Sequence, residues 1–202
     1  MIESRALGHK VGYCVWTPPD YAESKGRYPI IIVLHGMGGN ESHDSGLYGY
    51  PPMFETAIRE HLIPPCILVF PNGGNSGYRG KAEEMILKEV LPAVERSYRT
   101  TPQRALLGFS MGASGAANWL SKYPATFSAA VVWGGGPTSG RKMKNLWVIC
   151  GSLDSPNSRR QAAIKSGAKF TELPGVGHEL GKYHTQTGSL AFQFIADAWK
   201  RM

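Results

Sequence analysis

The sequence has little of several features that would assign it to a specialised class of protein. It contains only three cysteines, Cys14, Cys66 and Cys150, spread over 202 residues. An odd number without C-x-x-C spacing argues against a disulfide framework or a zinc site and favours buried thiols. No apolar run approaches the length that crosses a bilayer, and the N-terminal segment carries charges and lacks the apolar block of a signal peptide. We therefore expect a cytoplasmic protein without membrane contact, or a secreted one if a leader peptide has been removed.

Motifs for nucleotides and nucleic acids are also missing. The chain has neither G-x-G-x-x-G nor the lysine of a P-loop, so we expect no nucleotide cofactor. Its net charge is +7, but Lys and Arg are scattered and form no basic stripe interleaved with aromatic residues. We therefore expect no nucleic-acid partner. A cationic surface of this kind still favours acidic polymers or anionic substrates through long-range steering.

Short apolar runs rich in β-branched residues alternate with helical patterns along the chain. This order predicts an α/β protein with a mostly parallel central sheet and helices on both faces. We expect one domain over residues 1–202, with Pro92 bending the second helix. The strands are expected at 12–17, 30–34, 66–70, 104–109, 128–133, 146–150 and 169–173, and the helices at 53–61, 81–98, 111–122, 158–166 and 189–200.

The most informative motif is Gly108-Phe109-Ser110-Met111-Gly112, which follows the apolar run 105–107. It matches G-x-S-x-G, in which a serine lies on a sharp turn between a strand and a helix. Side chains at Gly108 or Gly112 would collide with backbone in this turn, and the serine is held in strained dihedral angles. The motif predicts Ser110 as a nucleophile. In the alternative interpretation, Ser110 only caps the helix that follows.

Three glycine-rich loops follow other predicted strands, at 35–40, 71–75 and 134–136. Because parallel strands end at the same edge of a sheet, we expect these loops to lie beside Ser110. Glycine is common in ordinary turns, but three such loops beside one serine favour close approach of the backbone to a ligand.

A serine nucleophile needs a base and an acid that orients the base, and in this type of sheet the chain order is serine, acid, histidine. The chain has four aspartates, and only Asp154 follows Ser110 in a loop directly after an apolar strand. The alternative role of Asp154 is a helix cap, since Ser155-Pro156-Asn157 follows. Glu179 is a weaker rival, because it is adjacent to the predicted base and such neighbours point apart.

His178 is the predicted base, in the loop after the last strand. His184 is its nearest competitor. The other histidines precede the serine and fit the chain order badly: His9, His35, His43 and His61.

The oxyanion formed during attack on an ester carbonyl needs backbone donors. One is expected to be the N–H of Met111, the residue after the nucleophile. The other is expected from Met37, in a loop that resembles the HG-type motif, with Gly36 as the alternative. Together with Gly38, this loop is expected to contact the substrate.

With these residues in place, the chain resembles the serine esterases of the α/β-hydrolase superfamily, in the group of esterase D-like, feruloyl esterase-like and polyhydroxybutyrate depolymerase-like enzymes. The resemblance spans nearly the whole chain and includes the segments 7–21, 28–36, 71–73 and 89–95. It implies the α/β-hydrolase fold and hydrolysis of carboxylic esters through an acyl-enzyme without a cofactor. Ser110 would be the nucleophile, His178 the base and acid, and Asp154 the residue that orients His178.

One departure from many lipases concerns the cap. Only about a dozen residues separate the predicted strands at 128–133 and 146–150, so we expect no cap domain. An uncapped site suits short acyl groups or esters that project from a polymer, including carbohydrate-linked and feruloyl esters. Aromatic residues near the predicted loops are candidates for stacking on an aromatic acyl group. They are Tyr48, Tyr50, Tyr78, Trp133 and Tyr183.

Other functions remain open from the sequence. The same three residues support acyl transfer to an acceptor other than water, or hydrolysis of a thioester. A peptidase is disfavoured, because nothing marks a peptide-binding subsite. A catalytically dead binding protein is a further alternative, but such relatives usually lack a member of the triad, and this chain retains all three.

Overall fold

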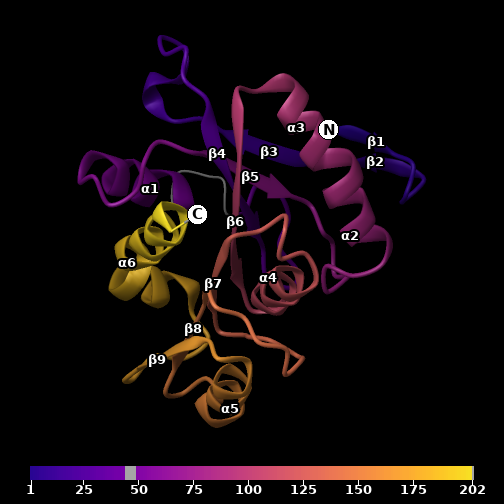
Figure 1. Cartoon of the computed structure of the whole chain (residues 1–202). Coiled ribbons are helices and arrows are strands. Elements are labelled where there is room, and N and C mark those ends of the chain that lie inside the picture. Colours follow the sequence, from indigo (N-terminus) through magenta and orange to yellow (C-terminus); the bar gives the residue numbers. More distant parts are fainter. Residues whose placement is uncertain (44–48, 202) are drawn as a thin grey trace.

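A computed structural model describes residues 1–43 and 49–201 of the chain. At its centre is a seven-stranded sheet with the order β3-β5-β4-β6-β7-β8-β9, in which β3 is antiparallel to its neighbour and every other pair is parallel (Figure 1). The strands are β3 (Tyr13–Trp16), β4 (Tyr28–Leu34), β5 (Ile67–Pro71), β6 (Thr100–Phe109), β7 (Ala129–Trp133), β8 (Leu146–Gly151) and β9 (Lys169–Leu173). All seven predicted strands are thereby confirmed, with ends that differ by up to four residues.

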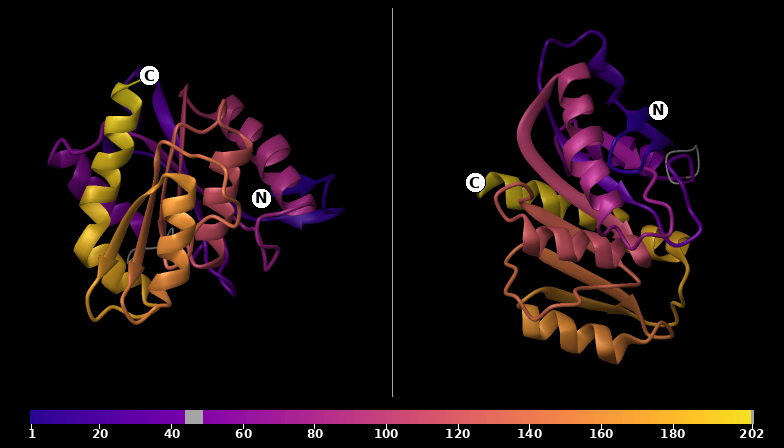
Figure 2. Two further views of the ribbon diagram at one scale, coloured as in Figure 1. Left: turned by 60° about the horizontal axis from the view of Figure 1, so that its bottom comes forward. Right: turned by 90° about the vertical axis from the view of Figure 1, so that its right-hand side faces the viewer.

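Helices cover both faces of the sheet. In the left view of Figure 2, α6 lies on one side of the strands and α4 and α5 lie on the other. The helices are α1 (Tyr50–Arg59), α2 (Lys81–Met85), the π-helical η2 (Ile86–Val90), α3 (Leu91–Ser97), α4 (Met111–Lys122), α5 (Pro156–Ser166) and α6 (Leu180–Lys200), with a short 3-10 turn η1 (Pro19–Tyr21).

The strands are apolar throughout because each face of the sheet has its own core. In β4, Ile30 and Ile32 belong to the cluster under α2, α3 and α4, while Ile31 and Val33 belong to the cluster under α1 and α6. All seven residues of β4 are buried. Such a strand cannot slip by one residue without exchanging its two buried faces, so its register against β6 is well specified.

Three local features differ from the sequence prediction. An antiparallel pair, β1 (Ile2–Ser4) and β2 (His9–Val11), lies outside the main sheet. The second predicted helix is continuous but widens to a π-helix just before Pro92, which has no N–H to donate and whose ring crowds the preceding turn.

The last helix begins at Leu180, nine residues before the predicted start at 189. Gly181 and Gly188 make this segment a poor helix by propensity, so tertiary packing decides its structure. A Cβ on Gly188 would lie 2.0 Å from Sδ of Met53, which shows that α6 lies close to α1 at this point.

One finding bears on access to the sheet edge. The connection between β7 and β8 spans residues 134–145 and contains no helix, in agreement with the expected absence of a cap.

The helices also bear on membrane contact. Among residues 1–43 and 49–201, every helix is too short or too polar to span a bilayer.

Candidate active site

Ser110 occupies the turn between β6 and α4. Its φ of 56° and ψ of −114° are strained for a non-glycine residue, and its N–H donates to the carbonyl of Trp133 over 2.9 Å. A Cβ on Gly108 would lie 2.3 Å from the Gly112 carbonyl oxygen, and one on Gly112 would lie 1.9 Å from that of Leu34. Ser110 makes no side-chain cap bond to α4, so its hydroxyl is available above the sheet edge.

His178 lies beside this hydroxyl. Its Nε2 is 2.8 Å from Oγ of Ser110, and its Nδ1 is 2.7 Å from Oδ2 of Asp154. Because the buried carboxylate only accepts hydrogen bonds, Nδ1 carries the ring proton and Nε2 is left as the acceptor for the serine proton. The Phe109 ring tilts against the imidazole at 4.6 Å between centroids and helps to hold its plane.

Gly134 leaves room for this pair. It has a φ of 61°, and a Cβ there would lie 3.0 Å from Oδ2 of Asp154 and 3.1 Å from the His178 ring. The third glycine-rich loop therefore approaches the two side chains by its backbone.

Asp154 is buried and has donors from three elements. Besides His178, the Tyr183 hydroxyl donates to Oδ2 over 2.7 Å and Arg159 pairs with Oδ1 over 2.7 Å. Burial raises the pKa of Asp154, but the hydrogen bonds from Arg159, His178 and Tyr183 outweigh it and hold the pKa below its usual value. The N-cap of α5 is Ser155, so Asp154 does not serve as the cap.

The two rivals considered from the sequence lie elsewhere. His184 lies in α6, and its ring packs against Tyr50 of α1 and Trp133 of β7. Burial lowers the pKa of His184 to about 4. Glu179 is exposed at the start of α6 and forms an ion pair with Lys182. Neither is placed to interact with Ser110.

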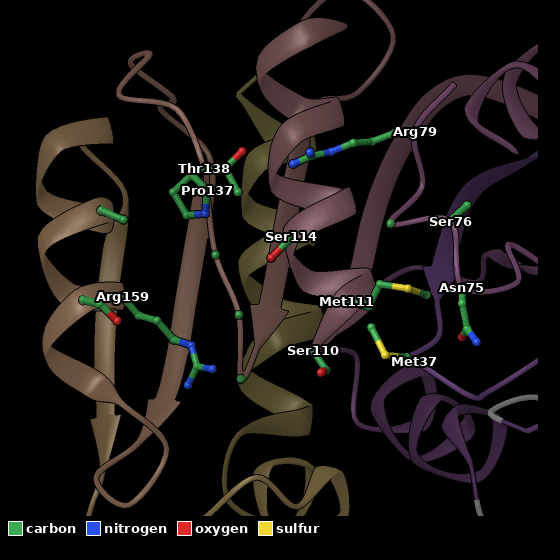
Figure 3. Close-up of a pocket in the computed structure, with 16 residues that line it drawn as sticks. Met37, Asn75, Ser76, Arg79, Ser110, Met111, Ser114, Pro137, Thr138 and Arg159 are labelled. Atoms are coloured by element: carbon green, nitrogen blue, oxygen red, sulfur yellow. The ribbon is translucent and has the colours of Figure 1, made fainter. Parts of the chain in front are cut away.

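The loop after β4 brings Met37 to the site. Met111 is the first residue of α4, so its N–H has no acceptor within the helix. Both methionines line the same cleft as Ser110 (Figure 3). The neighbouring Gly38 has a φ of 79° and donates its N–H to Oδ1 of Asn75 over 2.8 Å, which ties this loop to the one after β5.

His35 fixes the same loop from below. Its Nε2 accepts the N–H of Gly73 over 3.1 Å, so its proton lies on Nδ1 and is donated to the carbonyl of Gly36 over 2.7 Å. This buried histidine therefore joins the loops after β4 and β5. Its bond to the Gly36 carbonyl holds the backbone directly before Met37.

The cleft above Ser110 has a volume of about 740 Å³ and runs along the outer side of α4. Figure 3 shows Met37, Asn75 and Ser76 on one side of it, and Pro137, Thr138 and Arg159 on the other. The lining combines backbone, hydroxyl groups, apolar side chains and two arginines: Met37, Asn75, Ser76, Gly77, Arg79, Ser110, Met111, Ser114, Gly134, Gly135, Gly136, Pro137, Thr138, Ser158, Arg159 and Ala162.

The aromatic residues expected to contact a substrate do not line this cleft. Tyr50, Tyr78, Trp133 and Tyr183 are buried. The Trp133 indole donates to Thr187, and the Tyr183 hydroxyl accepts the N–H of Gly151 as well as bonding Asp154. Tyr48 lies outside the described residues.

Sequence reasoning missed Arg159, which lines the cleft and contacts Asp154. It also bonds the carbonyl of Asp154 and Sγ of Cys150. The sequence predicts a helix after the loop that carries Asp154, but nothing in it indicates that Arg159 contacts the carboxylate. In the described part of the chain, no group of three His, Cys, Asp or Glu side chains is arranged to hold a metal ion.

Comparison with known proteins identifies esterases among the matches. The family model named Esterase matches residues 4–149. The chain is 30% identical over 167 residues to Esterase Rv1288 of Mycobacterium tuberculosis, a match covering 76% of this chain and 35% of that protein. It is 25% identical over 178 residues to Endo-1,4-beta-xylanase/feruloyl esterase of Xylanibacter ruminicola, covering 76% of this chain and 24% of that protein. The chain thus spans about a third or less of these relatives, at 35% and 24% of their length.

Solved structures show the same fold over nearly the whole chain. A ferulic acid esterase superposes with a TM-score of 0.83 at 21% identity, covering 98% of this chain and 96% of that one. An S-formylglutathione hydrolase from Agrobacterium tumefaciens superposes with a TM-score of 0.78 at 13% identity, covering 98% and 93%. With the parallel sheet and its two helical layers, these likenesses confirm the expected α/β-hydrolase fold.

Proposed function

The chain belongs to the Esterase family, and from this premise we propose that it is a serine carboxylesterase in which Ser110, His178 and Asp154 act as a catalytic triad. The observation that carries the proposal is the unbroken chain of hydrogen bonds from Oγ of Ser110 through the imidazole to the buried carboxylate. A serine hydroxyl is a poor nucleophile until a base removes its proton, and this arrangement supplies the base already oriented.

The reaction would proceed in two halves. Nε2 of His178 takes the proton of Ser110 while Oγ attacks the ester carbonyl carbon, and the carbonyl oxygen becomes an oxyanion. The N–H groups of Met37 and Met111 are proposed to donate to this oxyanion. His178 then gives its proton to the departing alcohol oxygen, which leaves an acyl-enzyme on Ser110.

The second half repeats these proton transfers with water. His178 takes a proton from a water molecule, the resulting hydroxide attacks the acyl carbonyl, and the proton returns to Oγ of Ser110 as the carboxylic acid leaves. Asp154 remains ionised throughout and stabilises the imidazolium that forms in each half. Its lowered pKa supports this role.

The cleft favours a short acyl group on an alcohol that is itself accessible, including one carried by a carbohydrate or another polymer. It is open because no helix is inserted between β7 and β8, and its lining combines apolar surface with hydroxyl groups and two arginines. The names of the feruloyl esterase relatives support an aromatic acyl group. The lining found here includes no aromatic ring among the described residues, which favours smaller acyl groups.

The test compares hydrolysis of p-nitrophenyl acetate and methyl ferulate by the wild type and by Ser110→Ala. Ser114→Ala is the matched control, because Ser114 lines the same cleft one helical turn away. We expect loss of at least about a thousandfold in kcat for Ser110→Ala only. A fluorophosphonate probe should label the wild type and Ser114→Ala, but not Ser110→Ala.

Several outcomes would overturn the proposal. Activity that survives Ser110→Ala would assign the nucleophile to another residue. Absence of both hydrolysis and probe labelling in the wild type would favour a binding protein. Ester products formed with added alcohol, at the expense of free acid, would favour acyl transfer, and faster turnover of a matched thioester would favour a thioesterase.

A further inference from the structure

The cleft beside Ser110 carries positive charge that the proposed chemistry does not use. Its charged lining residues, within the part of the chain described, are Arg79 and Arg159, and no carboxylate is among them. Arg159 is paired with Asp154. The exposed Arg79 side chain forms no ion pair or hydrogen bond with any described residue. One guanidinium group is therefore free to bind a ligand.

Arg79 is attached to a firmly held piece of backbone. Its neighbour Tyr78 is 1% exposed and has a φ of 57°, a strained value for a tyrosine. The Tyr78 hydroxyl donates to the carbonyl of His35, and its own carbonyl accepts the indole N–H of Trp119 over 2.9 Å. Because Tyr78 is fixed in the core, Arg79 is held at the cleft and loses less freedom on binding a ligand.

The direction of Arg79 suits a ligand that also reaches Ser110. Figure 3 shows its guanidinium group extending over α4 into the cleft, beyond Ser114 as seen from Ser110. Ser114 is four residues along α4, which corresponds to about 6 Å of helix. A substrate with its ester at Ser110 must therefore extend along α4 by more than about 6 Å to reach Arg79.

Further positive charge lies on the other side of the loop that carries Arg79. A second hollow of about 410 Å³ shares Arg79, Asn75 and Ser76 with the cleft and is also lined by Lys10 and Lys81. Lys10 pairs with Glu3 where both side chains are mostly exposed, which neutralises little of the field. The chain as a whole has a net charge of +7. This distribution attracts anions to the Arg79 end of the cleft.

We propose that Arg79 binds an anionic group of the substrate, such as a carboxylate, while the ester of the same molecule lies at Ser110. The inference rests on the proposed esterase function and narrows its substrates to esters that carry an acid group. A guanidinium group suits this role because it presents a planar fork of donors that matches a carboxylate.

The experiment measures the kcat/KM of esters that differ only in charge. The mono(4-nitrophenyl) ester of adipic acid is compared with 4-nitrophenyl hexanoate, which has the same chain length and no acid group. A second pair places the charge on the leaving group: 3-carboxy-4-nitrophenyl acetate against p-nitrophenyl acetate. The pair of esters with the greater acid-to-neutral ratio of kcat/KM tells whether Arg79 contacts the acyl part or the alcohol part of the substrate.

The variants are Arg79→Gln, Arg79→Lys and Arg59→Gln. Arg59 is an exposed arginine at the end of α1, away from the cleft, and its replacement lowers the net charge equally. We expect the acid-to-neutral ratio of kcat/KM to fall about tenfold in Arg79→Gln, less in Arg79→Lys, and to stay unchanged in Arg59→Gln. High salt should reduce the wild-type preference.

The failures of the two proposals are distinguishable. If the wild type hydrolyses the neutral esters and the ratio is the same in Arg79→Gln, the assignment of Arg79 is wrong and the esterase stands. If no ester is hydrolysed, the esterase proposal fails. The role of Arg79 is then decided by the binding of monomethyl adipate, measured by NMR in Ser110→Ala and in the double variant that also carries Arg79→Gln. Equal affinity overturns the assignment of Arg79, and weaker binding in the double variant supports it.

Discussion

Replacement of Tyr183 by phenylalanine tests how Asp154 is held. Tyr183 is 0% exposed in α6, and its hydroxyl donates to Oδ2 of Asp154 over 2.7 Å while accepting the N–H of Gly151 over 2.8 Å. Phenylalanine keeps the ring and removes only the oxygen. The variant therefore leaves a buried backbone donor and one side of a buried carboxylate without this partner.

The expected loss of stability follows from these two contacts. A hydrogen bond to a charged group contributes about 1.5–3 kcal/mol, and a buried donor left unsatisfied costs about 1–3 kcal/mol. Both depend on the same oxygen and overlap, so we expect the free energy of unfolding to fall by about 2–4 kcal/mol at pH 7.

Part of this loss must depend on pH. The pKa of Asp154 in the folded protein is below its usual value, against the effect of burial, and the bond from Tyr183 is one cause. A carboxyl group of this kind stabilises the fold above its unfolded pKa, near 3.9, and that contribution disappears as pH falls through the lower folded pKa. In Tyr183→Phe the folded pKa moves back toward the usual value, so the contribution is smaller.

Urea unfolding of both proteins at pH 7 and at pH 3 measures the two parts. The difference in stability should be largest at pH 7 and smaller at pH 3, because pH 3 lies below the unfolded pKa and part of the carboxylate contribution is lost there, whereas the lost bond of Gly151 remains. An equal difference at both pH values would refute a bond to the ionised carboxylate. A difference below about 0.5 kcal/mol at pH 7 would refute the whole argument.

Two further substitutions test the elbow and the support of Asp154. Gly112→Ala places a Cβ 1.9 Å from the Leu34 carbonyl oxygen and should lower the free energy of unfolding by more than about 3 kcal/mol. The control Gly181→Ala, whose Cβ would have nothing within 4 Å, should cause no loss. Equal urea midpoints for the two variants would contradict the close approach of α4 to β4. Arg159→Met should lower kcat/KM about tenfold and stability by about 2 kcal/mol, because it removes the ion pair with Asp154. The control Arg160→Met breaks a more exposed ion pair with Glu172 and should change stability by less than about 1 kcal/mol. An effect as large as that of Arg159→Met would show that stability depends on the loss of a positive charge and not on the bond to Asp154.

Much of the site could be predicted because it depends on local sequence and chain order. A parallel sheet places the ends of its strands at one edge, so residues just after β6, β8 and β9 were expected near one another. The structure does place Ser110, Asp154 and His178 within hydrogen-bond distance. The glycines of the elbow were predictable for the same reason, since a turn this tight leaves no room for side chains.

The remainder of the site depends on contacts between segments far apart in the chain. The start of α6 at Leu180 could not be read from a segment containing Gly181 and Gly188, and with it the role of Tyr183 was missed. Arg159 is an exception in sequence separation: it lies five residues after Asp154, but nothing in the sequence indicates that its guanidinium group folds back onto the carboxylate. Tyr78 was expected at the substrate, but its position under the loop requires a positive φ that the sequence gives no reason to expect.

The shape of the cleft bears on why the same fold supports different substrates. The proposed catalytic groups follow the ends of β6, β8 and β9, which the sheet holds in fixed positions, while walls of the cleft come from the loops at 75–79 and 134–138. With no cap, an acyl chain at Ser110 stays partly open to solvent, so hydrophobic burial contributes less to binding than it would in a covered pocket. Polar contacts with a substrate that extends along α4 then add to its selectivity. Arg79, held by its buried neighbour, is the charged group best placed to make them, and a substrate with an acid group gains a contact there that a neutral ester of the same size lacks.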